Sequence, residues 1–226
     1  MLPADQALQE MAGKLRDAQR RIERLETLEA PGLTAGAVCL GTEVIVGSET
    51  EITFSSISQD FIHLWLLIHA GAVPTAIGAA MLLTFNGDSG SNYRSYNKSH
   101  IRDSGATDSD PVFGGVSSAS AIRLGHTAGN VGGDNDNFCA CEALIFNYTL
   151  SPGQLTATKR SVVWKGWDYS PLTGEEGELG FTGLRHGGGQ WINTVDPITS
   201  LTVSAGGGFA EFTDDSVFTL IGLCAA

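Results

Sequence analysis

The sequence predicts a mainly β protein in which an N-terminal α-helical coiled coil is followed by an antiparallel, jelly-roll-like β-sandwich. Three observations predict this fold class. Apolar residues in the first thirty positions alternate in steps of three and four. Of the 29 glycines only Gly13 lies in that segment, so 28 fall in the other 196 residues, which is about twice the usual share of roughly 7%. Those 196 residues also hold short apolar runs between turn signals, the pattern of many short strands.

Residues 1–30 form the predicted coiled coil. With Leu8 at position a of the heptad, the a and d positions are apolar and Gly13 falls at the exposed f position. A helix of this length is marginal alone, so its stability must come from burying the a/d seam against copies of itself. The stretch from Arg21 to Glu26 resembles the R-h-x-x-h-E signature common in parallel trimeric coiled coils, in which the arginine meets a neighbour's glutamate. The residues predicted to form the trimer are Leu8, Met11, Leu15, Ala18, Arg21, Ile22, Leu25 and Glu26. The alternative is an amphipathic helix that packs on its own head domain.

Ala30-Pro31-Gly32 ends the predicted helix. Residues 31–47 are the expected linker, and residues 48–226 are the expected β-sandwich head. We expect strands at residues 51–57, 61–69, 80–85, 119–124, 140–148, 162–167, 199–203 and 217–223, with long polar loops at 86–118 and 168–190. The run from Phe61 to His69 is apolar on both faces. We therefore expect it to be central in its sheet, with its other side covered by sheet, loop or a neighbouring subunit.

The formal net charge is −12, and the first thirty residues are nearly neutral, with five basic and six acidic side chains, so the head carries about −11. An acidic head repels phosphate backbones and anionic lipids, so we expect neither nucleic-acid binding nor attachment to a membrane by charge. The longest apolar run, residues 64–72, is far short of the ~18 residues that span a bilayer. The N-terminus does not resemble a signal peptide, so we expect synthesis in a cytoplasm.

The motifs that could carry chemistry all have simpler interpretations. Gly87-Asp88-Ser89-Gly90 matches the sequence around the nucleophile of chymotrypsin-like proteases, but no upstream histidine and acid motifs accompany it, so a tight turn is expected. Residues 134–137, D-N-D-N, could offer oxygen ligands to Ca²⁺, yet the terminal glutamate of an EF-hand is missing and a polar turn is expected. The four cysteines are expected to be free thiols. We expect no catalytic residues, no metal ligands, no cofactor and no enzymatic activity.

Five aromatic side chains follow glycine-rich segments or open the second predicted loop, where aromatic rings can stack on sugar faces. The candidate recognition residues are Tyr93, Tyr96, Trp167, Tyr169 and Trp191. The alternative is that these rings cap the sandwich core or a subunit interface.

Residues 82–93, L-L-T-F-N-G-D-S-G-S-N-Y, resemble a pattern, F-N-G-D-[ST]-G-x-N-Y, of tailed-bacteriophage virion proteins. Its flanks resemble that group in the same order: an I-x-F-x-x-I segment at 52–57, a strand ending in N-Y at 148, and W-I-N-T-V-D-P-I at 191–198. The closing S-V-F-T-L-I-G at 216–222 resembles the group's G-S-x-F-x-L-Y-G strand, with Asp215 and Ile221 in place of a glycine and an aromatic residue. The resemblance covers about residues 48–223 and implies a β-sandwich appendage of a phage particle.

The resemblance and the predicted trimer together favour a homotrimeric tail spike or short tail fibre, located in the virion, whose β-sandwich head contacts the host cell surface. The expected partners are two further copies of the chain, another virion protein that holds the N-terminal region, and a bacterial surface glycan. The alternatives are a capsid decoration, cement or head-fibre protein, and a glycan-cleaving depolymerase spike. The chain is short for a depolymerase, which usually needs a long β-helix.

Overall fold

A computed structural model describes residues 36–73, 80–102, 112–126, 128–129, 139–149, 160–170, 181–192, 196–206 and 211–224 of the chain. The chain divides into two compact units, Met1–Gly36 with Ala226, and Ala37–Ala225. The predicted coiled coil at residues 1–30 lies outside the described residues, as does the segment 134–137. The trimer seam and the calcium alternative therefore stay predictions.

The described residues form strands and contain no helix. The strands are β1 (Ala37–Val44), β2 (Glu51–Phe54), β3 (His63–Val73), β4 (Ala80–Phe85), β5 (Tyr93–Arg102), β6 (Val112–Ala119), β7 (Ile122–His126), β8 (Ala128–Gly129), β9 (Cys139–Phe146), β10 (Arg160–Ser170), β11 (Phe181–Trp191), β12 (Leu201–Ala205), β13 (Glu211–Phe212) and β14 (Val217–Leu223).

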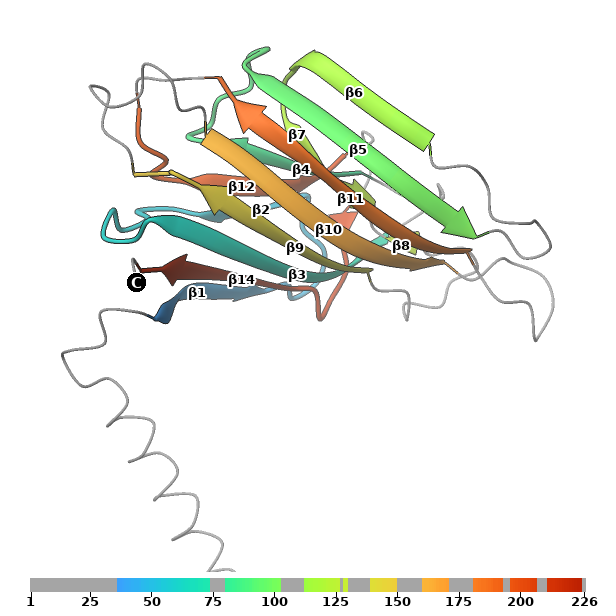
Figure 1. Ribbon diagram of the computed structural model, residues 1–226. Coiled ribbons are helices and arrows are strands. Elements are labelled where there is room, and N and C mark those ends of the chain that lie inside the picture. Colours follow the sequence, from blue (N-terminus) through green and yellow to red (C-terminus); the bar gives the residue numbers. More distant parts are fainter. Residues whose placement is uncertain are drawn as a thin grey trace, which may run out of the picture. The chain divides into compact units, whose positions relative to one another are not determined.

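These strands build two sheets that face each other (Figure 1). The small sheet has the order β2-β12-β4-β7. The large, ten-stranded sheet has the order β1-β14-β3-β9-β10-β11-β5-β6, and β8 and β13 both pair with β3. Strand pairs are antiparallel, except that β8 runs parallel to β3. The predicted mainly β class, with antiparallel sheets, is confirmed.

The core lies between the sheets and is filled by alternate residues of each strand, because successive side chains of a strand point to opposite faces. In the small sheet, β4 contributes Met81, Leu83 and Phe85, all at most 1% exposed. In the large sheet, Leu64 and Leu66 of β3 are completely buried, and so is Ile145 of β9. One contiguous cluster of buried residues joins both layers.

Several strands lie where the sequence predicted a linker or loops. β1 falls within the expected linker 31–47, and it pairs with β14 along its length. β5 and β6 lie in the predicted loop 86–118, and β11 lies in the predicted loop 168–190. These expectations were wrong because glycines and polar residues dominate the segments, and the sequence does not show which neighbouring strands their backbones join.

The clearest example is the glycine triplet Gly187-Gly188-Gly189. The sequence predicts a loop there, but the triplet lies inside β11 and forms no turn. A Cβ atom at Gly187 would sit 2.7 Å from Cζ2 of Trp164, and one at Gly189 would sit 2.6 Å from Cγ2 of Ile122. The Trp164 ring from the neighbouring strand β10 and the Ile122 side chain from β7 of the small sheet both pack directly on the bare backbone of β11. The glycines are therefore required by close packing within the large sheet and against the small one.

The strand predicted to be central is indeed central, since β3 lies between β14 and β9. Its inner residues are core residues, as expected. Its outer residues Trp65 and Leu67 are only half-buried. They belong to the surface described below.

Candidate functional site

The F-N-G-D-S-G segment is a structural turn whose aspartate organises one end of the sandwich. The Asp88 carboxylate accepts hydrogen bonds from Nε1 of Trp191 at 2.7 Å, the backbone N–H of Gly90 at 2.9 Å and Nδ2 of Asn92 at 3.0 Å. Partial burial raises the pKa of Asp88, but these hydrogen bonds outweigh it and leave the pKa below the ordinary value. The side chain therefore stays a carboxylate that fixes the turn. The turn interpretation of this segment is confirmed.

Tyr93, the last residue of the motif, completes the same structure from inside the core. The backbone N–H of Phe85 donates to its hydroxyl oxygen at 2.9 Å, and the hydroxyl donates to the carbonyl oxygen of Asp88, also at 2.9 Å. Burial raises the pKa of Tyr93 to about 12. Tyr93 is therefore a neutral, completely buried side chain whose hydroxyl group links β4 to the turn.

The other segments that carry the resemblance meet at this end of the sandwich. Asn86 accepts from the backbone N–H of Thr199 at 2.8 Å and donates to the carbonyl oxygen of Pro197 at 2.7 Å. Tyr148 donates to the carbonyl oxygen of Ser58 at 2.5 Å, and its own carbonyl oxygen accepts from the N–H of Ile198. Residues separated by more than a hundred positions therefore share one hydrogen-bond network. These segments therefore hold one end of the sandwich together.

The residues at the two ends of β14, the closing strand, are also held by close contacts with distant segments. Ser216 is completely buried, and its hydroxyl oxygen accepts from the backbone N–H of Gly71 at 3.1 Å. Asp215 before it has φ of +64°, a left-handed conformation that glycine adopts more easily than other residues and that Asp tolerates. Gly222 at the end of the strand is covered by Phe61, whose ring would be 2.5 Å from an added Cβ atom.

The surface available for binding is the outer face of the large sheet, on the side away from the small sheet. Cross-strand neighbours there form rows. One row runs Val217, His69, Ala140, Trp167 and Leu184 across β14, β3, β9, β10 and β11. A second row, four residues away along the strands, runs Ile221, Trp65, Leu144, Val163, Gly188 and Tyr96, reaching β5. The row between them runs Thr219, Leu67, Glu142, Lys165 and His186.

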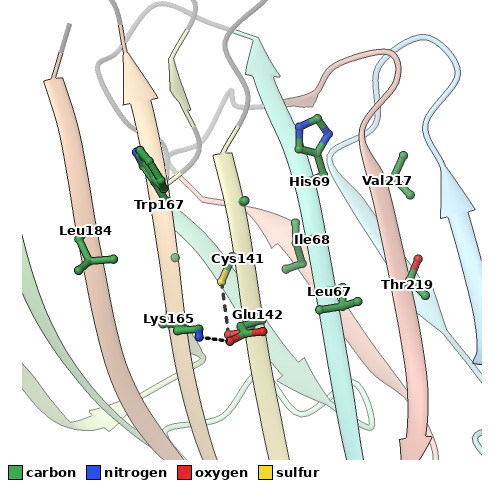
Figure 2. A pocket seen from close by; sticks show the side chains of 12 residues that line it. Leu67, Ile68, His69, Cys141, Glu142, Lys165, Trp167, Leu184, Val217 and Thr219 are labelled. Atoms are coloured by element: carbon green, nitrogen blue, oxygen red, sulfur yellow. Dashed lines mark hydrogen bonds and ion pairs between the residues drawn. The ribbon is translucent and has the colours of Figure 1, made fainter. Parts of the chain in front are cut away.

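Two hollows lie on this face. The first, of about 500 Å³, is lined mainly by the Val217–Leu184 row, and Figure 2 shows these side chains projecting from neighbouring strands. The second, of about 610 Å³, lies beside it around the Trp65–Val163 row. We call the large apolar residues of the outer face that line the two hollows the apolar patch: Trp65, Leu67, Leu144, Phe146, Val163, Trp167, Leu184, Val217 and Leu223.

The apolar patch is open to solvent in the described part of the chain. Trp167 is 61% exposed, and Val163 and Leu184 are each 56% exposed. Apolar side chains at isolated surface positions are ordinary, whereas a group of them on neighbouring strands is a candidate interaction surface.

One ion pair divides the two hollows. Lys165 Nζ lies 2.7 Å from Oε1 of Glu142 on the adjacent strand (Figure 2), and both residues line both hollows. The lysine side chain is 69% exposed, so the pair adds little stability. Because the charges cancel, the apolar patch carries no net charge at its centre.

A third, smaller hollow of about 330 Å³ lies further across the outer face, between β5, β10 and β11. Tyr96 of β5 is 46% exposed there, and its cross-strand neighbours on both sides are glycines, Gly188 and Gly115. Arg94 and Gln190 face each other in the register and line the same hollow. This Tyr96 hollow therefore combines an aromatic ring with a guanidinium and an amide group.

Four of the five candidate recognition residues separate into a buried pair and an exposed pair. Tyr93 and Trp191 are completely buried, so they are not surface residues and the core-capping alternative holds for them. Trp167 and Tyr96 are exposed on the same outer face. Tyr169 lies on β10, and its side chain is outside the described residues.

The sequence did not predict that strands β3, β9 and β10 together would expose an apolar surface. Its only signal was the run from Phe61 to His69, which is apolar on both faces.

Other site types find no support in the part of the chain that the structure describes. There, no group of three or more His, Cys, Asp or Glu side chains could hold a metal ion. The four cysteines are free, as predicted, but Cys39 is exposed while Cys139 and Cys141 are buried side by side on β9. Burial raises the pKa of the Cys141 thiol, which makes it unreactive. The described residues include no helix long and apolar enough to cross a membrane.

Comparisons with protein families, with curated proteins and with solved structures found no significant match.

Proposed function

We propose that this chain is a binding protein of a tailed-phage particle, a homotrimeric tail spike or short tail fibre whose head contacts the host cell surface. In this proposal residues 1–30 form the parallel trimeric coiled coil, and the two sheets are an elaborated jelly roll. The activity is binding without chemistry. Three weak contacts act together, and their effective concentration raises the avidity by orders of magnitude.

The observation that carries the proposal is the outer face of the large sheet. It presents exposed aromatic and aliphatic side chains on a backbone that is hydrogen-bonded on both sides of nearly every strand. A preformed surface of this kind binds without the cost of ordering its backbone. The segments on which the resemblance to virion proteins rests are joined by one hydrogen-bond network at one end of the head.

The Tyr96 hollow is the part of this face that suits a bacterial surface glycan. Tyr96 offers a ring face for stacking, while Gln190 and Arg94 offer donors and an acceptor to sugar hydroxyls. Arg94 is the charged residue that lines this hollow, so it locally reduces the repulsion that an acidic envelope polysaccharide would meet on an acidic head.

The test uses cells of the bacterium that the particle infects. The full chain is labelled, and its binding is compared with that of the variant Tyr96→Ala with Gln190→Ala. We expect at least a tenfold loss of affinity for the variant, and unchanged affinity for the control Val116→Ala, which alters an exposed valine on β6. Equal binding by the two proteins would contradict the glycan site.

A capsid decoration protein is the second candidate, and the apolar patch is the observation that favours it. Large apolar side chains without a matching set of hydrogen-bonding groups suit a protein partner better than a sugar. Cryo-electron microscopy of the particle separates the candidates, because it places the chain on the tail or on the capsid.

A further inference from the structure

We propose that the apolar patch binds a neighbouring copy of this chain, so that the heads as well as the N-terminal helices hold the oligomer together. The inference rests on the proposed trimer and assigns it a second contact surface. It leaves the Tyr96 hollow, further across the sheet, for the glycan.

Burial of the apolar patch against another protein surface is favourable, because its largest side chains are apolar and exposed to water. Trp167 and Leu184 are direct cross-strand neighbours, and Val163 lies on the same face of β10. More than half of each side chain is exposed. Their burial would contribute roughly 25 cal/mol for each Å² of apolar surface removed from water.

A second copy is the occupant that chain connectivity favours. The predicted seam ends near residue 30 and β1 begins at Ala37, and seven residues span at most about 25 Å. β1 is the edge strand of the large sheet, followed by β14, β3 and β9. Strands lie about 4.8 Å apart, so β9 in the middle of the patch is roughly 14 Å from β1. Copies joined at their N-terminal segments are therefore held within reach of one another's patches.

Charge also favours a copy at this position. The head carries about −11 by sequence, so two heads repel each other across most surfaces. Within the two hollows the charged residues are Glu142 and Lys165, which neutralise each other. Acidic heads can meet at the patch without this repulsion. A saccharide, by contrast, would leave most of its hydroxyl groups without partners there.

The four tryptophans allow the inference to be measured, because two of them are buried in the core and two lie on the outer face. Trp164 and Trp191 are at most 1% exposed, whereas Trp167 is exposed and Trp65 is half-buried, and both of the latter lie on the outer face. Quenching of tryptophan fluorescence by acrylamide therefore measures how accessible Trp65 and Trp167 of the apolar patch are to solvent. The full chain is compared with the seam variant Leu15→Asp with Ile22→Asp, and sedimentation gives the mass of each sample.

We expect the full chain to sediment at about 71 kDa, three times 23.7 kDa. The seam variant is diluted until it sediments as a monomer. The acrylamide quenching constant of the full chain should then be at least twofold below that of the seam variant. In the full chain, Val163→Lys with Leu184→Lys should raise quenching to the seam-variant level without lowering the mass. The control pair Val46→Lys with Val116→Lys, at valines 87% and 57% exposed elsewhere, should change neither quantity.

A trimer whose tryptophans are quenched as strongly as those of the monomeric seam variant would overturn this inference and leave the proposed trimer intact. Protection that persists in the monomeric seam variant would also overturn it, because residues of the same chain would then cover the patch. A full chain that stays monomeric at micromolar concentration would overturn both the inference and the proposed trimer.

Discussion

Replacing Asp88 with alanine should destabilise the sandwich by about 3 kcal/mol, although the residue lies in a turn. Its carboxylate accepts three hydrogen bonds, from Trp191, Gly90 and Asn92. Hydrogen bonds to a charged group contribute about 1.5–3 kcal/mol, and a buried donor left without a partner costs a similar amount. Because Trp191 is completely buried, we assign about 2 kcal/mol to its bond. The two exposed bonds account for the remaining ~1 kcal/mol.

A double-mutant cycle isolates the buried bond. The free energy of unfolding is measured by urea denaturation, followed by far-UV circular dichroism, for the wild type, Asp88→Ala, Trp191→Phe and the double variant. The coupling energy between the two positions should be about 2 kcal/mol. The variant Asp88→Asn keeps one acceptor oxygen and should lose less than Asp88→Ala. A coupling energy below about 0.5 kcal/mol would refute the structural role that we assign to the F-N-G-D-S-G motif.

Three further predictions test the packing and the electrostatics of the head. Gly187→Ala should destabilise by roughly 3 kcal/mol, because its Cβ atom would overlap Trp164; a thermal melt that is unchanged would contradict this. Tyr93→Phe should cost about 1–3 kcal/mol, because it leaves the N–H of Phe85 buried without an acceptor; urea denaturation measures the loss. The pKa of Asp88 is lower in the folded than in the unfolded chain, so its contribution is present above about pH 4 and is lost as the pH falls through the folded pKa. Between pH 5 and roughly pH 2.5, the free energy of unfolding should therefore fall less for Asp88→Asn than for the wild type. If the free energies of unfolding of the two proteins change in parallel with pH, Asp88 has the same pKa in the folded and the unfolded chain.

Some strands were predicted completely from short apolar runs between turn signals. β4 and β14 have the bounds that the sequence predicts, and in the structure both bury every second side chain. β11 was missed for a physical reason. Its glycines are selected by Trp164 and Ile122, which approach from other strands, and sequence periodicity contains no information on that approach.

The site was predicted in part. Trp167 and Tyr96 were expected at the surface and are exposed on the outer face. Tyr93 and Trp191 follow glycine-rich segments as well, but they are buried because each finds a polar partner at the Asp88 turn. For Trp191 that partner is 103 positions away. The rows of the outer face could not be predicted, because they depend on the registers of β14, β3, β9 and β10.

A cryo-electron microscopy map of the particle that carries this chain would show whether the outer face of the large sheet is the binding surface of a trimeric phage appendage. We predict three copies joined at their N-terminal segments on the tail, with the density of a neighbouring copy covering Trp167, Val163 and Leu184. A map in which the chain is monomeric, or in which these three side chains face bulk solvent, would contradict the account.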